Sequence, residues 1–555
     1  MVNSITHEPV ARALVYSPDN RFAMLTDDQG RFEFAAPPEP AAPPPGQPDT
    51  STGGMESYSG PLRSFPNFPG ILMARKPGFL GSSNFSWRGN QVVIIPGNDV
   101  TIPVVPEARI VGRVVLPSSN ASDRISVVLY RRQITEGRGH WAQAASVVAR
   151  SNGEFRFADL EPGNYKLLTG ELMDRDPLTF DPRGPAYGYP PAYFPNASNF
   201  QSAATISLSA GMTFQAELSP VRQPYYTVRV PVANAPPDSH IAVTVSAQGR
   251  KGPGFELGYS RGSQKIEGSL PSGTYVIEAT ALGENGMSGS VNLVIKDAAT
   301  ESAAMTMRPN GSVLVKVKRE LQAAPGTEDT GEKVEQASSS RQQQPLPGDF
   351  SARLEPADEF GVSDTFFNPQ SAARDQSSEL ITGVGPGRYW VRVETARGYV
   401  ASVIAGDVDL LHRPLTVGPV ANVVVDVTIR DEGAEISGSI EGMSEPTPEG
   451  AGWVVTAGGH FANESMTGVA PHVYLLPLPE SPGQFRQVAV EPDGKFDLQQ
   501  VPPGAYRVLA FDHSQAELEY YTSEAMRAYD GKGRVVRLGA GQKEKLTLRL
   551  LSTSE

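Results

Sequence analysis

The residues of this chain that could best contact a ligand are aromatic side chains gathered in two short stretches. One is the proline-rich stretch YGYPPAYFPNASNF at positions 187–200, and the other is ELEYYTSEAMRAY at positions 517–529. Exposed aromatic rings offer rigid area with few rotamers to lose, so they can stack on sugars or anchor a protein partner. The alternative, which is the commoner role of such connections, is that the rings cover the end of a folded domain. The candidate ligand-binding residues are Tyr187, Tyr189, Tyr193, Phe194, Tyr520 and Tyr521.

No group of residues has a spacing that predicts catalysis or metal binding. The chain has no cysteine, and none of its seven histidines belongs to an HxH or HExxH motif. Asp512 and His513 are sequence neighbours, whose side chains point to different faces of a strand. Asp407 and Asp409 lack the further oxygens of a calcium-binding loop. The sequence therefore predicts a protein that is not an enzyme, with no catalytic residue, no metal site and no cofactor.

The composition argues against several classes of partner. Lysine and arginine total 48, and aspartate and glutamate total 61, so the net charge is −13. Such an acidic chain is not expected to offer a positively charged surface to nucleic acid or to an anionic membrane. No run of 18 apolar residues is present, so we expect no membrane-spanning segment. The 55 glycines and 49 prolines indicate many turns, and a length of 555 residues indicates several domains.

The elements that must position the aromatic stretches belong to a short sequence motif that repeats along the chain, which we call the recurring word. Its glycines at positions 163, 273, 387 and 504 are separated by 110, 114 and 117 residues, which is the size of a domain rather than of a solenoid repeat. Each copy has two segments of alternating apolar and polar residues around a Pro/Gly turn, which we interpret as a β-hairpin. The copies read ARSNGEFRFADLEPGNYKLLTG, QKIEGSLPSGTYVIEAT, DQSSELITGVGPGRYWVRVET and EPDGKFDLQQVPPGAYRVLAFD.

Two further words recur with the same period. One, such as ATISLSAGMTFQAEL from Ala204, is interpreted as a closing hairpin, and an opening strand such as RIVGRVVLP from Arg109 follows most of the closers. Opener, middle hairpin and closer together predict β-sandwich domains with almost no linker between them. The predicted domains are residues 1–106, 107–221, 222–309, 310–431 and 432–555, of which the third is divergent.

The first predicted domain departs from the pattern. It has no opening strand, and its strand TDDQGRFEF from Thr26 is separated from the return strand GILMARKPGF by a Pro-rich insert at 35–61. A similar insert at 322–348 interrupts the fourth domain. Segments of this composition bury too little apolar surface to fold, so both inserts are predicted to be disordered surface loops.

These words resemble the carboxypeptidase regulatory-like domain, a transthyretin-like sandwich of the carbohydrate-binding-like superfamily. The family's opening turn, its T-D-x-x-G-x-F-x-F strand and its P-G-x-Y strand are matched by NSITHEPVARALV, TDDQGRFEF and PPGAYRVLAF. His7 stands where the family usually has glycine, and the third domain lacks the Asp/Asn-Gly turn. The resemblance covers essentially the whole chain and is greatest to multi-copy proteins of the acidobacterial exported type. It implies an all-β fold, a tandem array of about five transthyretin-like or Ig-like β-sandwich domains.

The same resemblance implies a non-catalytic exported scaffold or binding protein that binds carbohydrate or protein through its loops. Its partner would be a glycan or a cell-surface protein, and its place periplasmic, outer-membrane-associated or extracellular. The alternative is an accessory segment of an outer-membrane receptor or a secreted peptidase system. Family members begin several residues before the first turn, so we expect the true start and the signal peptide to lie upstream of Met1. Five domains placed end to end would extend on the order of 150 Å.

Overall fold

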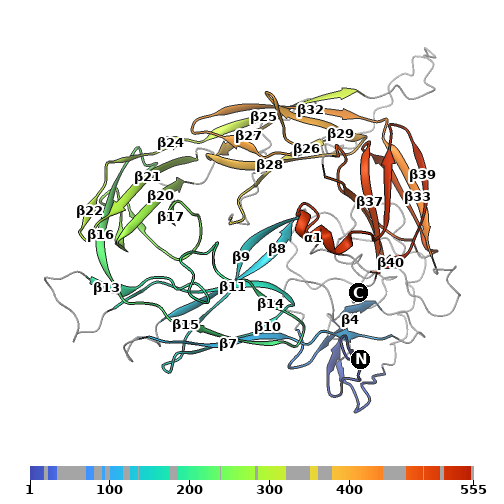
Figure 1. Cartoon of the computed structure of the whole chain (residues 1–555), viewed down its shortest axis with the longest axis horizontal. Coiled ribbons are helices and arrows are strands. Elements are labelled where there is room, and N and C mark those ends of the chain that lie inside the picture. The colour runs from blue at the N-terminus through green and yellow to red at the C-terminus, as the bar shows by residue number, and fades with distance from the viewer. Residues whose placement is uncertain are drawn as a thin grey trace, which may run out of the picture.

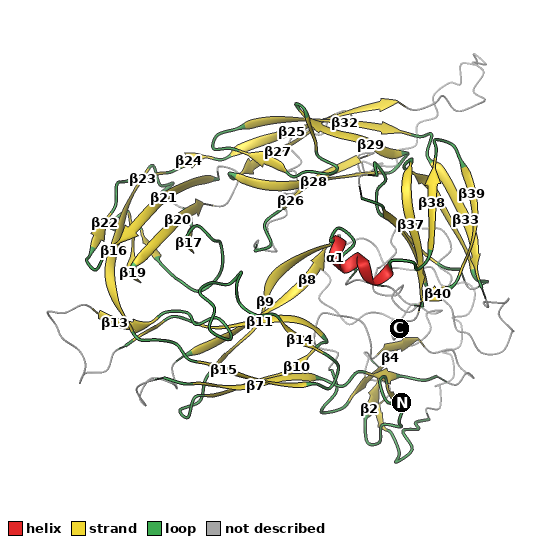
Figure 2. Cartoon of the chain, in the orientation of Figure 1, coloured by secondary structure: helices red, strands yellow, loops and turns green. Residues whose placement is uncertain are grey.

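The described part of the chain is all-β. The exception is one short helical segment, made of α1 (Ser523–Met526) and the 3₁₀ turn η3 (Arg527–Tyr529), which is seen in red in Figure 2. The strands form several small sheets that pair into tandem sandwiches. The computed structural model describes residues 1–17, 23–33, 71–80, 91–93, 100–116, 125–135, 137–174, 186–237, 239–281, 286–320, 350–360, 378–441, 471–479, 481–491, 493–512, 515 and 518–551. The two predicted inserts, 35–61 and 322–348, lie outside these residues.

The second sandwich shows the strand pattern most completely. Its two sheets have the strand orders β10-β7-β15 and β14-β11-β8-β9. The opening strand β7 pairs in parallel with the last strand, β15, and antiparallel with β10. The strands are β7 (Ala108–Val114), β8 (Ser126–Thr135), β9 (Arg138–Val148), β10 (Glu154–Leu160), β11 (Gly163–Thr169), β14 (Ile206–Leu208) and β15 (Thr213–Leu218).

The fourth and fifth sandwiches repeat this pairing. In the fourth, β25 pairs in parallel with β32 and antiparallel with β27, and in the fifth β33 does the same with β39 and β36. The fourth sandwich contains β25 (Gly311–Glu320), β26 (Phe350–Pro356), β27 (Ser378–Val384), β28 (Gly387–Thr395), β29 (Tyr399–Ala405), β30 (Val408–Asp409), β31 (Leu415–Val417) and β32 (Asn422–Arg430). The fifth contains β33 (Ala434–Ile440), β34 (His472–Pro477), β35 (Arg486–Ala489), β36 (Lys495–Val501), β37 (Gly504–Phe511), β38 (Arg534–Leu538), β39 (Lys543–Leu548) and β40 (Leu550–Leu551).

The sheet of the third sandwich includes strands from the segment that precedes it. β12 (Leu172–Met173) and β13 (Ala186–Tyr189) follow β11 in the chain, yet they extend the sheet of the third sandwich, where β13 pairs with β16. The second and third sandwiches are therefore joined by a shared sheet. The remaining strands are β16 (Gln223–Ala233), β17 (Ile241–Ala247), β18 (Gly258–Ser260), β19 (Lys265–Pro271), β20 (Gly273–Ala281), β21 (Met287–Ile295), β22 (Thr300–Glu301), β23 (Met305–Thr306) and β24 (Arg308–Pro309).

The first sandwich has the fewest strands among the described residues. Its β1 pairs in parallel with β6, as an opener pairs with a last strand elsewhere, and a second sheet has the order β3-β2-β4-β5. The prediction of a strand at TDDQGRFEF is wrong over residues 26–33. These residues instead form a turn, in which backbone amides donate hydrogen bonds to the Asp27 carboxylate. The strands are β1 (Val2–Asn3), β2 (Leu14–Tyr16), β3 (Ala23–Leu25), β4 (Ile71–Arg75), β5 (Gln91–Val93) and β6 (Pro103–Val104).

The recurring word is not a hairpin, which corrects the sequence prediction. Its two strands lie in opposite sheets: β10 pairs with β7, whereas β11 pairs with β8 and β14. The same holds for β19 and β20, β27 and β28, and β36 and β37, and the closing words also cross between sheets. Three residue steps separate Leu160 from Gly163, and such a span, about 10 Å when extended, matches the distance between packed sheets. The word therefore carries the chain across the core.

The tyrosine of each P-G-x-Y word stabilises the segment that crosses from one sheet to the other. Tyr165, Tyr275, Tyr389 and Tyr506 are all buried, and each hydroxyl donates a hydrogen bond to the carbonyl oxygen four residues earlier, at 2.5–3.0 Å. The arrangement resembles the tyrosine corner of immunoglobulin-type sandwiches, in which a buried ring satisfies a backbone carbonyl upstream. One side chain thus fills the core and also donates a hydrogen bond to a backbone carbonyl that would otherwise be buried without a partner.

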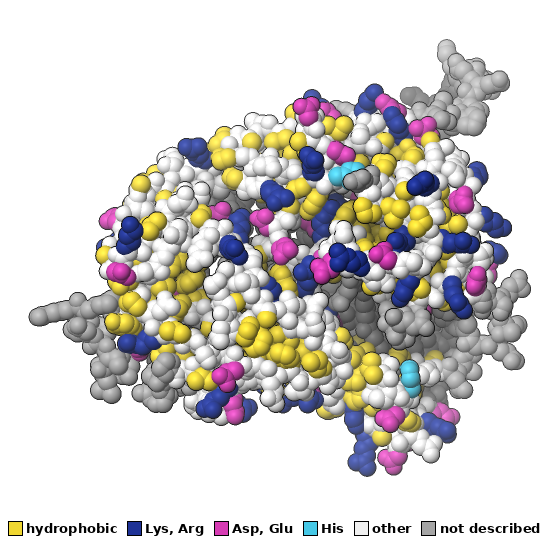
Figure 3. Space-filling model, viewed as in Figure 1, with side chains coloured by type: hydrophobic (Ala, Val, Ile, Leu, Met, Phe, Trp, Pro, Cys, Tyr) yellow, Lys and Arg dark blue, Asp and Glu magenta, His cyan; other side chains and the backbone are white. Residues whose placement is uncertain are grey.

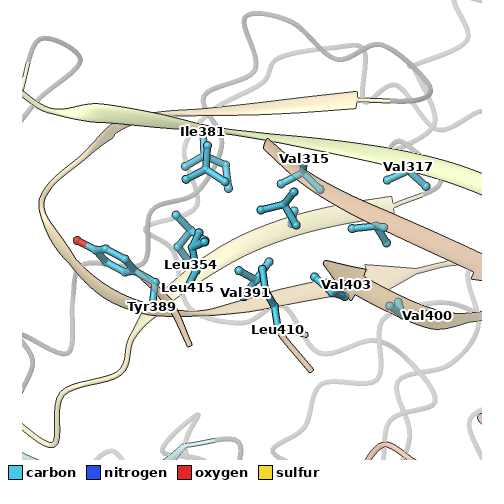
Figure 4. Packing of buried hydrophobic residues seen from close by; sticks show 14 of the residues in the cluster. Val315, Val317, Leu354, Ile381, Tyr389, Val391, Val400, Val403, Leu410 and Leu415 are labelled. Carbon is cyan, nitrogen blue, oxygen red and sulfur yellow. The ribbon is translucent and has the colours of Figure 1, made fainter. Parts of the chain in front are cut away.

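Alternating side chains from the two sheets form each core. In the fourth sandwich Val315 and Ile381 from one sheet face Val391 from the other, and Figure 4 shows their side chains between the ribbons. Such burial is worth about 1.5–3 kcal/mol for each aliphatic side chain. Separate clusters of this kind occupy the other sandwiches.

The sandwiches do not form an extended string. In Figure 1 the second to fifth sandwiches follow one another around a closed curve, and the hairpin β8–β9 of the second reaches α1 of the fifth. Hydrogen bonds and ion pairs between these distant segments, described below, hold the curve closed. The expectation of an end-to-end length on the order of 150 Å is therefore wrong.

Candidate binding site at the hairpin junction

The hairpin β8–β9 is the element that brings three sandwiches together. Its strands are 10 and 11 residues long, whereas the corresponding β34 and β35 of the fifth sandwich have six and four. The extra length carries the tip of the hairpin beyond its own core and into contact with the fourth and fifth sandwiches. We call this contact region the hairpin junction; it comprises residues 130–135, 137–141, 355–360, 390–392 and 518–529.

Arg138 lies at the centre of the hairpin junction. Its guanidinium carbon lies 3.7 Å from the ring centroid of Trp390 and 3.6 Å from that of Tyr521, so the cation contacts one ring from the fourth sandwich and one from the fifth. Burial, together with the nearby charge of Arg392, lowers the pKa of Arg138 to about 10. The guanidinium remains charged at neutral pH, and aromatic faces are the partners that stabilise a poorly solvated cation.

An ion pair and a close backbone contact join the hairpin to the fifth sandwich. Arg132 Nη2 lies 2.5 Å from Glu519 Oε1, and the same oxygen accepts a hydrogen bond from Thr522. The amide of Tyr521 donates to the carbonyl of Gly137 at 3.2 Å. A Cβ on Gly137 would lie only 2.4 Å from the Tyr520 ring, so this contact requires glycine at the tip.

The hairpin also contacts the fourth sandwich through residues 359 and 360. The amide of Trp141 donates to the carbonyl of Glu359 at 2.8 Å, and Phe360 packs against Tyr130 and Phe200. These rings belong to a buried cluster separate from the core of the second sandwich. The junction is thus an apolar interface as well as a polar one.

A cavity of about 240 Å³ opens between the hairpin and the helical segment. The second sandwich contributes Arg132, Ile134 and Asn164 to its lining, and the fifth contributes residues of the segment 518–529. It lies between two sandwiches, and ligand sites commonly lie at such domain interfaces. The hairpin junction is therefore the candidate functional site.

The structure does not gather the six predicted aromatic residues into one site. Tyr189 and Tyr193 are buried, and the Tyr193 hydroxyl donates to the carbonyl of Pro253. Tyr187 is covered by the Arg222 guanidinium at 3.9 Å, and Phe194 packs against the core of the second sandwich. These four lie where the second sandwich meets the third. Their positions match the alternative role of covering a domain end, and ligand binding by them stays a prediction.

Tyr520 and Tyr521 lie at the hairpin junction instead. The Tyr520 ring stacks on Phe485 at 4.1 Å, and Tyr521, which is 40% exposed, contacts Arg138. Sequence reasoning missed Arg132, Arg138 and Trp390, the residues that these tyrosines accompany. The available signal was the length of the segment SVVLYRRQITEGRGHWAQAASVV between the opener and the recurring word.

Asp409, one of the two aspartates considered for calcium binding, has structural partners. Asp409 accepts a hydrogen bond from the Leu411 amide at 2.9 Å and lies 2.9 Å from His412 Nδ1. His412 Nε2 lies 3.0 Å from the Ser481 carbonyl, and this hydrogen bond raises the pKa of His412. Among the described residues no group of three or more His, Asp or Glu side chains could hold a metal. His513 lies outside the described residues.

One buried carboxyl group lies at the seam of the second and third sandwiches. Glu171 Oε1 is buried and has no hydrogen-bond partner among the described residues. Burial raises the pKa of Glu171 to about 7, although the nearby Tyr225 hydroxyl and the backbone of Glu256 oppose the shift. This group therefore titrates near neutral pH.

Comparison with known proteins does not assign the chain to a family. No family model and no curated protein matches the chain. Similar solved structures include the TIE protein of Bacillus anthracis (10% identity, 77% of this chain and 68% of that chain, TM-score 0.14). They also include a streptococcal ancillary pilin (11%, 58% and 99%, TM-score 0.19) and the full-length RrgB pilus protein of Streptococcus pneumoniae (8%, 80% and 98%, TM-score 0.13). These TM-scores are too low for the likenesses to carry an argument about function. The chain is a multi-domain all-β protein of tandem sandwiches.

Proposed function

We propose that the chain is a non-catalytic, exported scaffold or binding protein that binds a glycan or a cell-surface protein through its loops. The observation that carries the proposal is the hairpin junction, where segments of three sandwiches are held together and two of them line a cavity. A junction of this kind fixes the relative positions of the surrounding loops, and binding costs less when the binding groups are ordered in advance. The carboxypeptidase regulatory-like resemblance of the words is consistent with an accessory rather than a catalytic role.

The charge of the surface is consistent with a glycan or a cell-surface protein as the partner. Basic and acidic side chains are interspersed on the face shown in Figure 3, and the net charge is −13, so a polyanionic partner is disfavoured. In the described part of the chain no helix is both long and apolar enough to cross a membrane.

The test is binding of the labelled full chain to glycan and cell-surface protein arrays, together with assays for peptide and glycoside hydrolysis. We expect saturable binding to a restricted set of ligands and no turnover. Turnover that is lost on substitution of a single carboxylate would contradict the proposal, as would the absence of any bound ligand on either array.

A further inference from the structure

The cavity at the hairpin junction has two walls of complementary character. The wall from the second sandwich carries Arg132 and Asn164, and the opposite wall carries Glu519 and Tyr529. Apolar side chains, including the two alanines of the helical segment, complete the lining. Polar residues and an aromatic residue therefore line a common space.

Two polar groups of the lining remain to bind a ligand. Arg132 Nη2 forms the ion pair to Glu519, and Arg132 Nε is buried and out of reach of a ligand in the cavity. Asn164 Oδ1 accepts from Ser207 at 2.7 Å, which leaves the amide NH₂ to donate. Glu519 Oε1 is shared by Arg132 and Thr522, so the other carboxylate oxygen is the one positioned to accept from a ligand.

The charge and the size of the cavity limit the class of ligand. The one cation, Arg132, and the one anion, Glu519, already neutralise each other, so an ionic ligand would lack a countercharge. A volume of about 240 Å³ corresponds to about eight waters at roughly 30 Å³ each, which is less than a drug-sized ligand fills. Donors and an acceptor around an aromatic face suit a small, neutral ring that carries several hydroxyl groups.

We propose that this cavity binds a single neutral sugar ring. Planar amide and carboxylate groups can each engage adjacent hydroxyls, and the Tyr529 ring can cover the apolar face of the sugar. This proposal rests on the proposed binding function and names the ligand class of its candidate site. Because walls from two sandwiches form the cavity, bound sugar would also stabilise the closed arrangement.

The test is saturation-transfer NMR on the full chain with glucose, galactose, mannose and N-acetylglucosamine. Glucuronate and glucosamine serve as charged counterparts, and we expect each to bind at least tenfold more weakly than the best neutral sugar. Ala528→Trp, on the exposed rim of the cavity, should weaken binding of that sugar at least tenfold, and Asn164→Ala about fivefold. Ser523→Trp is the matched control, since Ser523 is exposed on the same helical segment and does not line the cavity.

Three results would overturn the assignment: no signal from any neutral sugar, equal or stronger binding of a charged sugar, or binding that Ala528→Trp leaves unchanged. The proposed function would fail on a different result, which is the absence of any bound ligand on the arrays. If Ala528→Trp still binds the array ligands, binding lies elsewhere on the protein and only the sugar site is refuted.

Discussion

At the scale of single residues, the buried tyrosines of the recurring word combine packing with hydrogen bonding. Tyr506 is fully buried, donates to the Pro502 carbonyl at 2.5 Å and accepts from the Gln484 amide at 3.2 Å. Tyr506→Phe keeps the ring but leaves the buried Pro502 carbonyl and the partly buried Gln484 amide unpaired, so we expect a loss of about 1–3 kcal/mol in the free energy of unfolding. Chemical denaturation followed by fluorescence measures it. Tyr259→Phe, at a partly buried ring on β18, is the control, and an equal effect there would show that the hydrogen bonds of Tyr506 do not matter.

Glu171 makes stability depend on pH in the opposite sense to an ion-paired carboxylate. Its pKa is about 7 in the folded protein and near 4.5 when unfolded, so the folded state holds its proton over a range where the unfolded state loses it. Stability from this group is therefore complete below about pH 4.5 and is lost as pH rises to about 7, by up to roughly 3 kcal/mol. Glu171→Gln should make the protein more stable than the parent at pH 8 and change it little at pH 4.

The control for this pH effect is Glu217→Gln, which changes an exposed carboxylate on β15 of the second sandwich. Denaturation midpoints of the three proteins at pH 4 and pH 8 give the comparison. If Glu171→Gln and Glu217→Gln shift stability equally at both pH values, the buried carboxyl does not control the pH dependence.

At the scale of elements, the hairpin β8–β9 depends on the glycine at its tip. Gly137 has a φ of 72°, and a Cβ there would meet the Tyr520 ring at 2.4 Å. Gly137→Ala should therefore both strain the turn and separate the hairpin from the fifth sandwich. Gly249 has a φ of 70° and no atom within 4 Å of the added Cβ, so Gly249→Ala isolates the cost of strain, about 1 kcal/mol. We expect only Gly137→Ala to increase protease cleavage in the segment 518–529, and equal cleavage in both variants would refute the contact.

The strands were easier to predict from sequence than their pairing. Alternation in KFDLQQV and GAYRVLAF marks β36 and β37 correctly, because one face of each strand must meet the core. The same alternation occurs whether two strands are neighbours in one sheet or face each other across the core, so the crossing was mistaken for a hairpin. Nor does the pattern show that β13 joins the next sandwich, or that Arg138 meets Trp390, since both depend on contacts between distant segments.

At the scale of the whole molecule, contacts at several seams close the curve of sandwiches. Lys251 of the third sandwich pairs with Asp358 of the fourth at 3.4 Å, and Gln484 of the fifth donates to the Val400 carbonyl of the fourth at 2.5 Å. These contacts join neighbours in the sequence order. The hairpin junction differs, because it joins the second sandwich to the fourth and fifth, which do not adjoin it in the sequence order.

Arg138→Ala tests whether the closed arrangement depends on the hairpin junction. The variant removes both cation–π contacts, each worth about 2 kcal/mol where the cation is desolvated, and leaves Trp390 and Tyr521 without their partner. We expect the radius of gyration from small-angle X-ray scattering to rise while the β-sheet circular dichroism signal stays unchanged, since each sandwich keeps its own core. Arg156→Ala, at an exposed position of β10, should leave both measurements as in the parent. An unchanged radius for Arg138→Ala would mean that the apolar contacts of Phe360 and the Arg132–Glu519 pair hold the curve closed without it.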